Sequence, residues 1–270
     1  MPGVSGVQVL PLANRPRPIA FYRYRPMGAS TIVDWAVRWQ LAAAVSGAVR
    51  KKAILRHALS PIARSRQSCG ERKTVDRPAW MPDELAHAGT EHLDPGYVPG
   101  YDRKAGTDPA EDVEVLRGLG LGKAHTVVDL GAGTGTFALA IAPFCHRVIA
   151  VDVSPVMLGL LDEKVRQHGI DNVTLVQSGF LGYRHQGEPA DAVYSRNALH
   201  HLPDFWKVVA LDRVAAILKP GGVLRLHDLV YSFEPGDAER ALEAWFAGAV
   251  THPEHGWTRA ELETHVREEH

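Results

Sequence analysis

The sequence has little of what several protein classes depend on. Its only cysteines, Cys69 and Cys145, are too few for a disulfide framework or a cysteine-based metal cage. The most apolar stretch, residues 32–49, is interrupted by Asp34 and Arg38, so no transmembrane helix or membrane insertion is predicted. These scarcities exclude a small disulfide-stapled scaffold and a membrane-spanning protein, and they favour a cytoplasmic location.

The chain also has almost no net charge, but its charged residues are unevenly distributed. The formal net charge of the 270 residues is −1. Residues 1–80 contain 14 Lys and Arg against 3 Asp and Glu, whereas residues 81–270 contain 16 against 28. Such different balances predict two separate segments. We expect residues 1–80 to be a basic extension, poorly ordered or partly helical from about Ser30 to Leu59, and residues 81–270 to form one folded domain.

The role of the basic extension stays open. It could be an arm for nucleic acid or a membrane surface, a transit peptide, or an extension without a role of its own. Met81 also looks like a natural start of the folded part, so a misassigned upstream start is a further hypothesis. Binding of nucleic acid is not expected of the folded domain.

The strongest positive feature is a glycine-rich turn after an apolar run. Gly131, Gly133 and Gly135 follow residues 126–130, and Asp152 lies 21 residues after the first glycine. Glycines let the backbone approach a ligand closely, and an acidic residue at an offset of about 20 residues meets ribose hydroxyls in nucleotide-binding folds. The spacing predicts a site for an adenosine-containing cofactor.

The spacing also discriminates between cofactors. The dinucleotide fingerprint places its third glycine where this chain has Thr136, and Asp129 would repel a pyrophosphate. S-adenosylmethionine has a sulfonium and an ammonium group and no phosphate, so it suits the pattern better. A nicotinamide-dependent oxidoreductase is therefore the less favoured alternative.

Short apolar runs alternate with helical patterns after Met81. This alternation predicts an α/β fold, a mostly parallel sheet with helices on both faces and ligands at the carboxyl ends of its strands. The predicted strands are 126–130, 147–151, 173–177, 190–195 and 223–228, and the predicted helices are 109–118, 136–142, 154–168, 204–218, 237–249 and 258–269.

Four ordered segments resemble class I S-adenosylmethionine-dependent methyltransferases of the small-molecule type. They are residues 127–137, 151–158, 191–202 and 218–224, within a resemblance that covers about 94–233. The resemblance implies a Rossmann-like methyltransferase fold, S-adenosyl-L-methionine as the cofactor and a small-molecule methyl acceptor. A protein that binds this cofactor but is catalytically impaired is an alternative.

The resemblance also implies a set of site residues. The turn would meet the methionine end of the cofactor and Asp152 would hold the ribose. Asp129 is an electrostatic partner of the cofactor's amino group or a strand-end cap, and Val153 and Met157 flank the adenine or belong to the core. The implied cofactor-binding residues are Asp129, Gly131, Ala132, Gly133, Gly135, Asp152, Val153, Met157, Ser178, Gly179, Phe180 and Asn197.

One position departs from the family pattern. Gly179 stands where the family usually has an acidic residue that binds the adenine amino group. Ser178 or backbone groups could replace that contact, and Phe180 could stack on the ring. A missing charged hydrogen bond costs about 1.5–3 kcal/mol, so binding would be weaker rather than abolished.

His200 and His201 are the candidate catalytic residues. A neutral imidazole can accept a proton from an acceptor at physiological pH, although the pair could instead cap a loop. Tyr97 and Tyr101 would form a lid or simply pack in a loop. No metal is expected, because the His252–His255 motif contains a proline and has no third ligand nearby.

The carboxyl end predicts an incomplete sheet. After residue 228 the patterns are helical only, so the last two strands of the family's sheet are expected to be missing. The fifth strand would then have a bare edge, which a homo-oligomer or another element could cover. Truncation of the chain would have the same signature.

Overall fold

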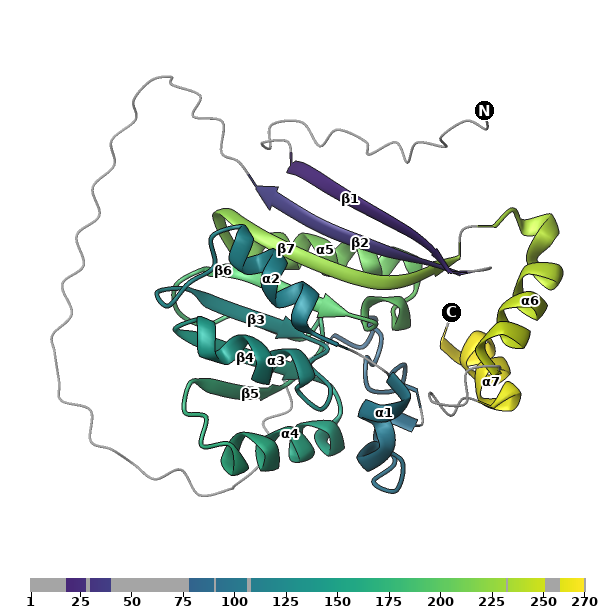
Figure 1. Cartoon of the computed structure of the whole chain (residues 1–270), viewed down its shortest axis with the longest axis horizontal. Coiled ribbons are helices and arrows are strands. Elements are labelled where there is room, and N and C mark those ends of the chain that lie inside the picture. Colours follow the sequence, from purple (N-terminus) through teal and green to yellow (C-terminus); the bar gives the residue numbers. More distant parts are fainter. Residues whose placement is uncertain are drawn as a thin grey trace, which may run out of the picture.

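The computed structural model describes residues 18–27, 30–39, 78–89, 91–105, 108–231, 233–250 and 258–269. Its centre is a seven-stranded sheet with the order β1-β2-β7-β6-β3-β4-β5 (Figure 1). The bounds are β1 Pro18–Met27, β2 Ser30–Trp39, β3 Thr126–Leu130, β4 Arg147–Asp152, β5 Val173–Gln177, β6 Ala190–Arg196 and β7 Leu218–Tyr231. The five strands from β3 to β7 run parallel to one another. This is the predicted parallel sheet, and all five predicted strands lie within it.

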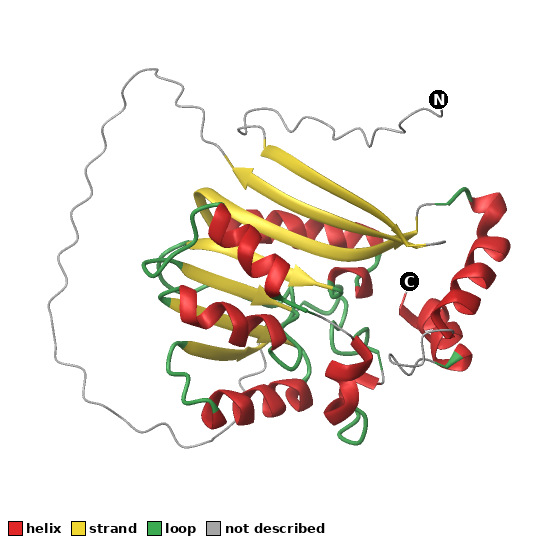
Figure 2. Ribbon diagram, viewed as in Figure 1, coloured by secondary structure: helices red, strands yellow, loops and turns green. Residues whose placement is uncertain are grey.

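Helices cover both faces of the parallel part (Figure 2). The helices are α1 Tyr101–Ala105, α2 Ala110–Gly118, α3 Thr136–Ile141, α4 Pro155–Gln167, α5 Asp204–Ile217, α6 Ala238–Val250 and α7 Arg259–Glu269. Buried side chains of α2, α3 and α4 pack on one face of the sheet, and those of α5 pack on the other. The predicted α/β architecture is confirmed. None of the helices in the described ranges is both long and apolar enough to cross a membrane.

Side-chain alternation explains how β3 joins the two layers. Val128 and Leu130 belong to the cluster on the α5 face, and Val127 belongs to the cluster on the α3 face. Successive side chains of a strand point to opposite faces, so Asp129 points toward α3. Each strand of this buried sheet therefore reads as a nearly continuous apolar run.

Helix α4 begins where the sequence predicts. The Ser154 hydroxyl accepts a hydrogen bond of 3.1 Å from the backbone N–H of Met157, and Pro155 occupies the first helical position. Both features are typical of helix starts, since they satisfy or remove an orphan N–H group. Gly169, with φ +64°, follows the end of the helix.

The amino-terminal segment corrects one expectation. We expected a helix-like stretch from Ser30 to Leu59, but residues 30–39 form β2 and pair antiparallel with β7. Strand β1 in turn pairs antiparallel with β2. β-branched and aromatic residues are frequent in 30–39, so strand propensity outweighs the helical pattern.

The hairpin of β1 and β2 lies at the edge that the sequence left bare. After β7 the described residues form helices only, as expected, so the carboxyl-terminal part of the chain adds no strand within the described ranges. The long edge of β7 is instead paired over Ser30–Arg38 of the same chain (Figure 1). A second copy of the protein is not needed to cover it.

Candidate functional site

The glycine turn connects β3 to α3 at the carboxyl edge of the sheet. Gly131 has φ +76°, and a Cβ atom there would lie 2.3 Å from the Cβ of Ala198. Gly135 has φ +85°, and its Cβ would lie 2.0 Å from Cδ1 of Leu161. Real Cβ atoms essentially never approach so closely. The positive φ favours glycine at both positions, and at Gly131 the space beside Ala198 requires it as well, whereas the end of the Leu161 side chain near Gly135 can move. The turn therefore packs tightly against α4 and against the loop after β6.

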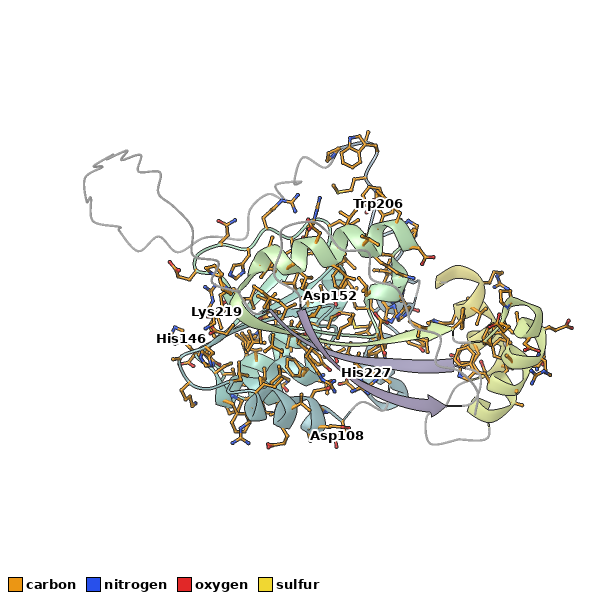
Figure 3. The ribbon with its side chains drawn as sticks, turned by 90° about the horizontal axis from the view of Figure 1, so that it is seen from above. Asp108, His146, Asp152, Trp206, Lys219 and His227 are labelled. Atoms are coloured by element: carbon orange, nitrogen blue, oxygen red, sulfur yellow. The ribbon has the colours of Figure 1, made fainter. Side chains whose placement is uncertain are left out.

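Asp152 ends β4 beside this turn and is 9% exposed (Figure 3). Its Oδ2 accepts a hydrogen bond of 2.7 Å from the N–H of Gly133, and its Oδ1 accepts one of 2.8 Å from the N–H of Ser154. Burial raises the pKa of Asp152, and the two N–H groups oppose that rise. A carboxylate oxygen has two lone pairs, so each oxygen retains an acceptor site for a ligand hydroxyl.

A pocket of about 650 Å³, including its open mouth, lies over the turn and Asp152. The predicted site residues that line it are Gly131, Gly133, Asp152, Val153, Met157, Ser178, Gly179, Phe180, Asn197 and His201. Segments after four neighbouring strands thus meet in one cavity.

Four predicted site residues do not line this pocket: Asp129, Ala132, Gly135 and His200. Asp129 is 1% exposed and accepts a hydrogen bond from the backbone N–H of Ala138, in the first turn of α3. Burial and the nearby charge of Asp152 raise the pKa of Asp129 well above its usual range. The structure thus gives Asp129 a helix-capping contact, while its role toward a cofactor stays a prediction.

Lining residues that the sequence reading missed are Glu84, Ala88, His92, Tyr101, Arg196, Ala198 and Leu202, of which Tyr101 was considered only as part of a lid. Glu84, Ala88 and His92 precede the first strand of the parallel sheet, where no motif singles them out. Arg196 and Leu202 lie inside a motif that we quoted. Their position at the end of β6 and in the loop that follows it was the available signal.

Hydrogen bonds hold the segment before α2 against the glycine turn and the start of α4. The Ser154 hydroxyl donates a hydrogen bond of 2.6 Å to the carbonyl oxygen of His92. On α1, the Asp102 carboxylate accepts hydrogen bonds from the Thr134 hydroxyl and, at 2.6 Å, from Nζ of Lys164. Tyr101 lines the pocket, whereas Tyr97 precedes the turn of Val98–Gly100 and is not a lining residue.

The two predicted catalytic histidines have different surroundings. His200 is 6% exposed, and its Nδ1 lies 2.6 Å from Oδ1 of Asp228. The other oxygen of Asp228 accepts hydrogen bonds from the backbone N–H groups of Leu199 and His200. His201 lines the pocket, and its ring centroid lies 4.2 Å from that of His200. His201 is therefore the member of the pair that a ligand in the pocket can meet.

The polypeptide between β6 and these histidines has a constrained backbone. Asn197 has φ +48°, the only positive φ of a non-glycine residue among the described ranges. Its N–H donates a hydrogen bond of 2.8 Å to the carbonyl of His227. Such backbone geometry is uncommon for a residue with a side chain and is frequent at binding sites.

Within the described ranges no three or more His, Cys, Asp or Glu side chains are grouped as metal ligands. The His252–His255 motif lies outside the described residues.

The fold and the pocket together define a class of protein. A parallel sheet, a glycine turn after its central strand and a carboxylate at the end of the neighbouring strand form a site for an adenosine-containing cofactor. The residues present fit such a group, since the turn leaves room for close approach and Asp152 retains acceptor capacity for ribose hydroxyls.

Comparisons with known proteins find a methyltransferase domain in the central part of the chain. Residues 127–222 match a family model described as a methyltransferase domain. The uncharacterized methyltransferase YcgJ of Bacillus subtilis is 33% identical over 104 residues, which are 38% of this chain and 40% of that protein. Phosphoethanolamine N-methyltransferase 2 of Caenorhabditis elegans is 29% identical over 150 residues, which are 55% and 30% of the two chains. Over residues 127–222 the chain thus matches a methyltransferase domain, and both of these relatives are named as methyltransferases.

The sequence similarity covers only part of the length of these relatives. The chain spans less than half the length of either of these two curated relatives. The solved structure of YcgJ from Bacillus subtilis aligns with a TM-score of 0.42 and 20% identity, over 58% of this chain and 83% of that one.

Proposed function

We propose that this protein transfers the methyl group of S-adenosylmethionine to a small-molecule acceptor. The observation that carries the proposal is the meeting of the glycine turn, Asp152 and His201 in one pocket. The first two suit the cofactor, and the third is a proton acceptor beside the place where an acceptor molecule would enter. The bound cofactor supplies an electrophilic methyl group on a sulfonium, so the protein has mainly to bind, align and exclude water.

Asp152 anchors the cofactor in this proposal. Its oxygens are held by the N–H groups of Gly133 and Ser154, so it does not have to be ordered when the ligand arrives. The glycine turn lies toward β3 and contacts the methionine end. Val153, Met157 and Phe180 lie toward β5 and offer apolar surface to the base.

His201 is the proposed base that takes a proton from the acceptor. His200 positions it: Asp228 holds Nδ1 of His200, and the two imidazole rings are in contact. A hydrogen bond at one nitrogen fixes the tautomer and the orientation of a histidine ring. Asp228 also binds the backbone of Leu199 and His200, so the whole turn is held against β7.

A small acceptor is supported by the lining of the pocket. The pocket has to hold the cofactor as well as the acceptor, and the segment containing His92 and Tyr101 lines part of it. Among the relatives, phosphoethanolamine N-methyltransferase 2 has a small-molecule substrate in its name, and a release factor glutamine methyltransferase has a protein substrate in its name. The acceptor class therefore rests on the pocket rather than on the relatives.

The test has two stages. Titration calorimetry with S-adenosylhomocysteine and with NAD should show binding of the former; binding of NAD alone would contradict the proposal. The protein is then incubated with methyl-labelled cofactor and a metabolite extract. Label in a small molecule supports transfer, whereas binding without any transfer would favour a catalytically impaired cofactor-binding protein.

A further inference from the structure

Glu84 brings a carboxylate to the pocket from outside the sheet. It belongs to the turn at residues 83–88, which Met81 anchors in the same apolar cluster as Phe180 and Leu181. Oε1 of Glu84 accepts a hydrogen bond of 2.9 Å from the N–H of Leu181, and Oε2 accepts one of 2.9 Å from the N–H of Gly182. The carboxylate is thus fixed against the loop that follows β5.

The same carboxylate fills the place of a missing side chain. A Cβ atom on Gly179 would lie 2.3 Å from Oε1 and 2.4 Å from Cδ of Glu84. The backbone of Gly179 is not in the left-handed region, so the residue is glycine here for space and not for conformation. Where a side chain at position 179 would project, the protein has the carboxylate of Glu84 instead. Both residues line the pocket.

The order of the strands indicates which part of the cofactor lies there. The strands β3, β4 and β5 are neighbours in that order. The glycine turn follows β3, Asp152 is the last residue of β4, and Gly179 lies just after β5. Ribose hydroxyls belong at the middle position, at Asp152. The ribose separates the methionine part from the nucleobase, so a methionine part at the glycine turn places the base beside Gly179 and Glu84.

We propose that Glu84 recognises the exocyclic amino group of adenine and thereby selects an aminopurine cofactor. The inference rests on the proposed function, because it takes S-adenosylmethionine as the ligand. An ionised carboxylate only accepts hydrogen bonds, and an exocyclic amino group is a donor. A purine with an oxo group at that position presents an acceptor to the same oxygens and is rejected.

The surroundings allow Glu84 to act in this way. The backbone N–H groups of Leu181, Gly182 and Phe180 occupy at most three of the four lone-pair positions of the carboxylate, so at least one is left for a ligand donor. Burial raises the pKa of Glu84, and the N–H groups of Leu181 and Gly182 together with the charge of Arg213 counteract that rise. Burial outweighs these contributions, so the net shift of the Glu84 pKa is upward, and the N–H donors and the cation on α5 limit that shift.

The first test compares two ligands on three proteins. Calorimetry measures the affinities of S-adenosylhomocysteine and S-inosylhomocysteine, which has an oxo group in place of the amino group. The proteins are the full chain, Glu84→Ala and the control Asp171→Ala, which removes an exposed carboxylate that does not line the pocket. Glu84→Ala should bind S-adenosylhomocysteine at least about tenfold more weakly than the wild type does. It should also lose the preference of the wild type for S-adenosylhomocysteine over S-inosylhomocysteine. The control should match the wild type for both ligands.

The second test moves the carboxylate from position 84 to position 179. Gly179→Asp alone should weaken binding, because its side chain collides with Glu84, whereas the double variant Glu84→Ala with Gly179→Asp should recover affinity for S-adenosylhomocysteine. Recovery also shows that the single variants do not fail through misfolding.

The outcomes separate the two proposals. An equal loss of affinity for both ligands in Glu84→Ala, or no loss for either, overturns the role of Glu84 and leaves the proposed function intact. Failure of the wild-type protein to bind S-adenosylhomocysteine overturns the proposed function and this inference together.

Discussion

Oδ2 of Asp152 accepts a hydrogen bond of 2.7 Å from the backbone N–H of Gly133, which joins the end of β4 to the glycine turn. The contact orients the carboxylate before any ligand binds. Replacement of Asp152 by Ala should therefore weaken binding of S-adenosylhomocysteine at least tenfold, since it removes charged hydrogen bonds worth about 1.5–3 kcal/mol each. Calorimetry measures the change.

Asp162→Ala is the matched control, because Asp162 is an exposed carboxylate on the same helix α4, paired with Arg166. Its affinity should equal that of the wild type. An Asp152→Ala protein with unchanged affinity would show that the ribose contact is assigned to the wrong residue.

His201→Gln should lower methyl transfer by about 10²-fold or more, because a positioned general base contributes 10²–10⁴-fold in typical enzymes. Affinity for the cofactor should change little, since the imidazole is proposed to meet the acceptor. Single-turnover transfer from labelled cofactor measures the rate. Loss of cofactor binding in step with the rate would contradict the assignment as a base.

Asp228→Asn tests whether the hydrogen bond between Asp228 and His200 positions His201 for proton transfer. The amide cannot hold Nδ1 of His200 as the carboxylate does, so the pH profile of transfer should shift as well as the rate. A merely structural role would lower the rate at every pH by the same factor.

The contact between Asp102 and Lys164 should slow release of the cofactor. Nζ of Lys164 lies 2.6 Å from Oδ2 of Asp102 and also donates to the carbonyl of Thr134, so it joins α1 to the glycine turn. Lys164→Met should raise the dissociation rate of S-adenosylhomocysteine several-fold, which stopped-flow measurements resolve. The neighbouring exposed Arg166→Met serves as the control, and equal rates in all three proteins would show that the contact does not gate release.

His227, labelled in Figure 3, should make the fold sensitive to acid. Burial and the charges of Arg196 and Arg225 lower its pKa to about 3, so the ring is neutral in the folded protein. Between pH 6.5 and about 3 the unfolded chain binds a proton at His227 that the folded protein does not bind. The free energy of unfolding is therefore highest above pH 6.5 and decreases as the pH falls toward 3. Denaturant unfolding at pH 7, 6 and 5 should show a slope of up to about 1.4 kcal/mol per pH unit that His227→Gln removes. The same slope in both proteins would assign the acid sensitivity to other groups.

A chain that begins at Pro78 tests the hairpin. It lacks β1 and β2, so the long edge of β7 is left unpaired, and such edges promote association. Light scattering after size exclusion should show oligomers or aggregates, in contrast to the full chain. A stable monomer would mean that the hairpin contributes little to the sheet.

Local patterns predicted the centre of the fold because each element there is specified by nearby residues. Ser154 and Pro155 set the start of α4, and the glycines of the turn set the end of β3, within a residue of the prediction. The hairpin was missed because the partner of Ser30–Trp39 is β7, far along the chain, and no local signal records that pairing. Glu84 was missed for the same reason: the sequence shows the gap at Gly179, but only the folded chain shows which carboxylate fills it.

The pairing of β2 with β7 also sets an order of events during folding. Ser30 lies opposite Tyr231 in the register. Strands β1 and β2 are therefore synthesised some 200 residues before β7, the partner of β2. Pairings of such long sequence separation form slowly and leave apolar strands exposed meanwhile. The β2–β7 pairing therefore forms only after β7 has been synthesised. Until then the nascent protein has to avoid pairing of the β1–β2 hairpin with other strands.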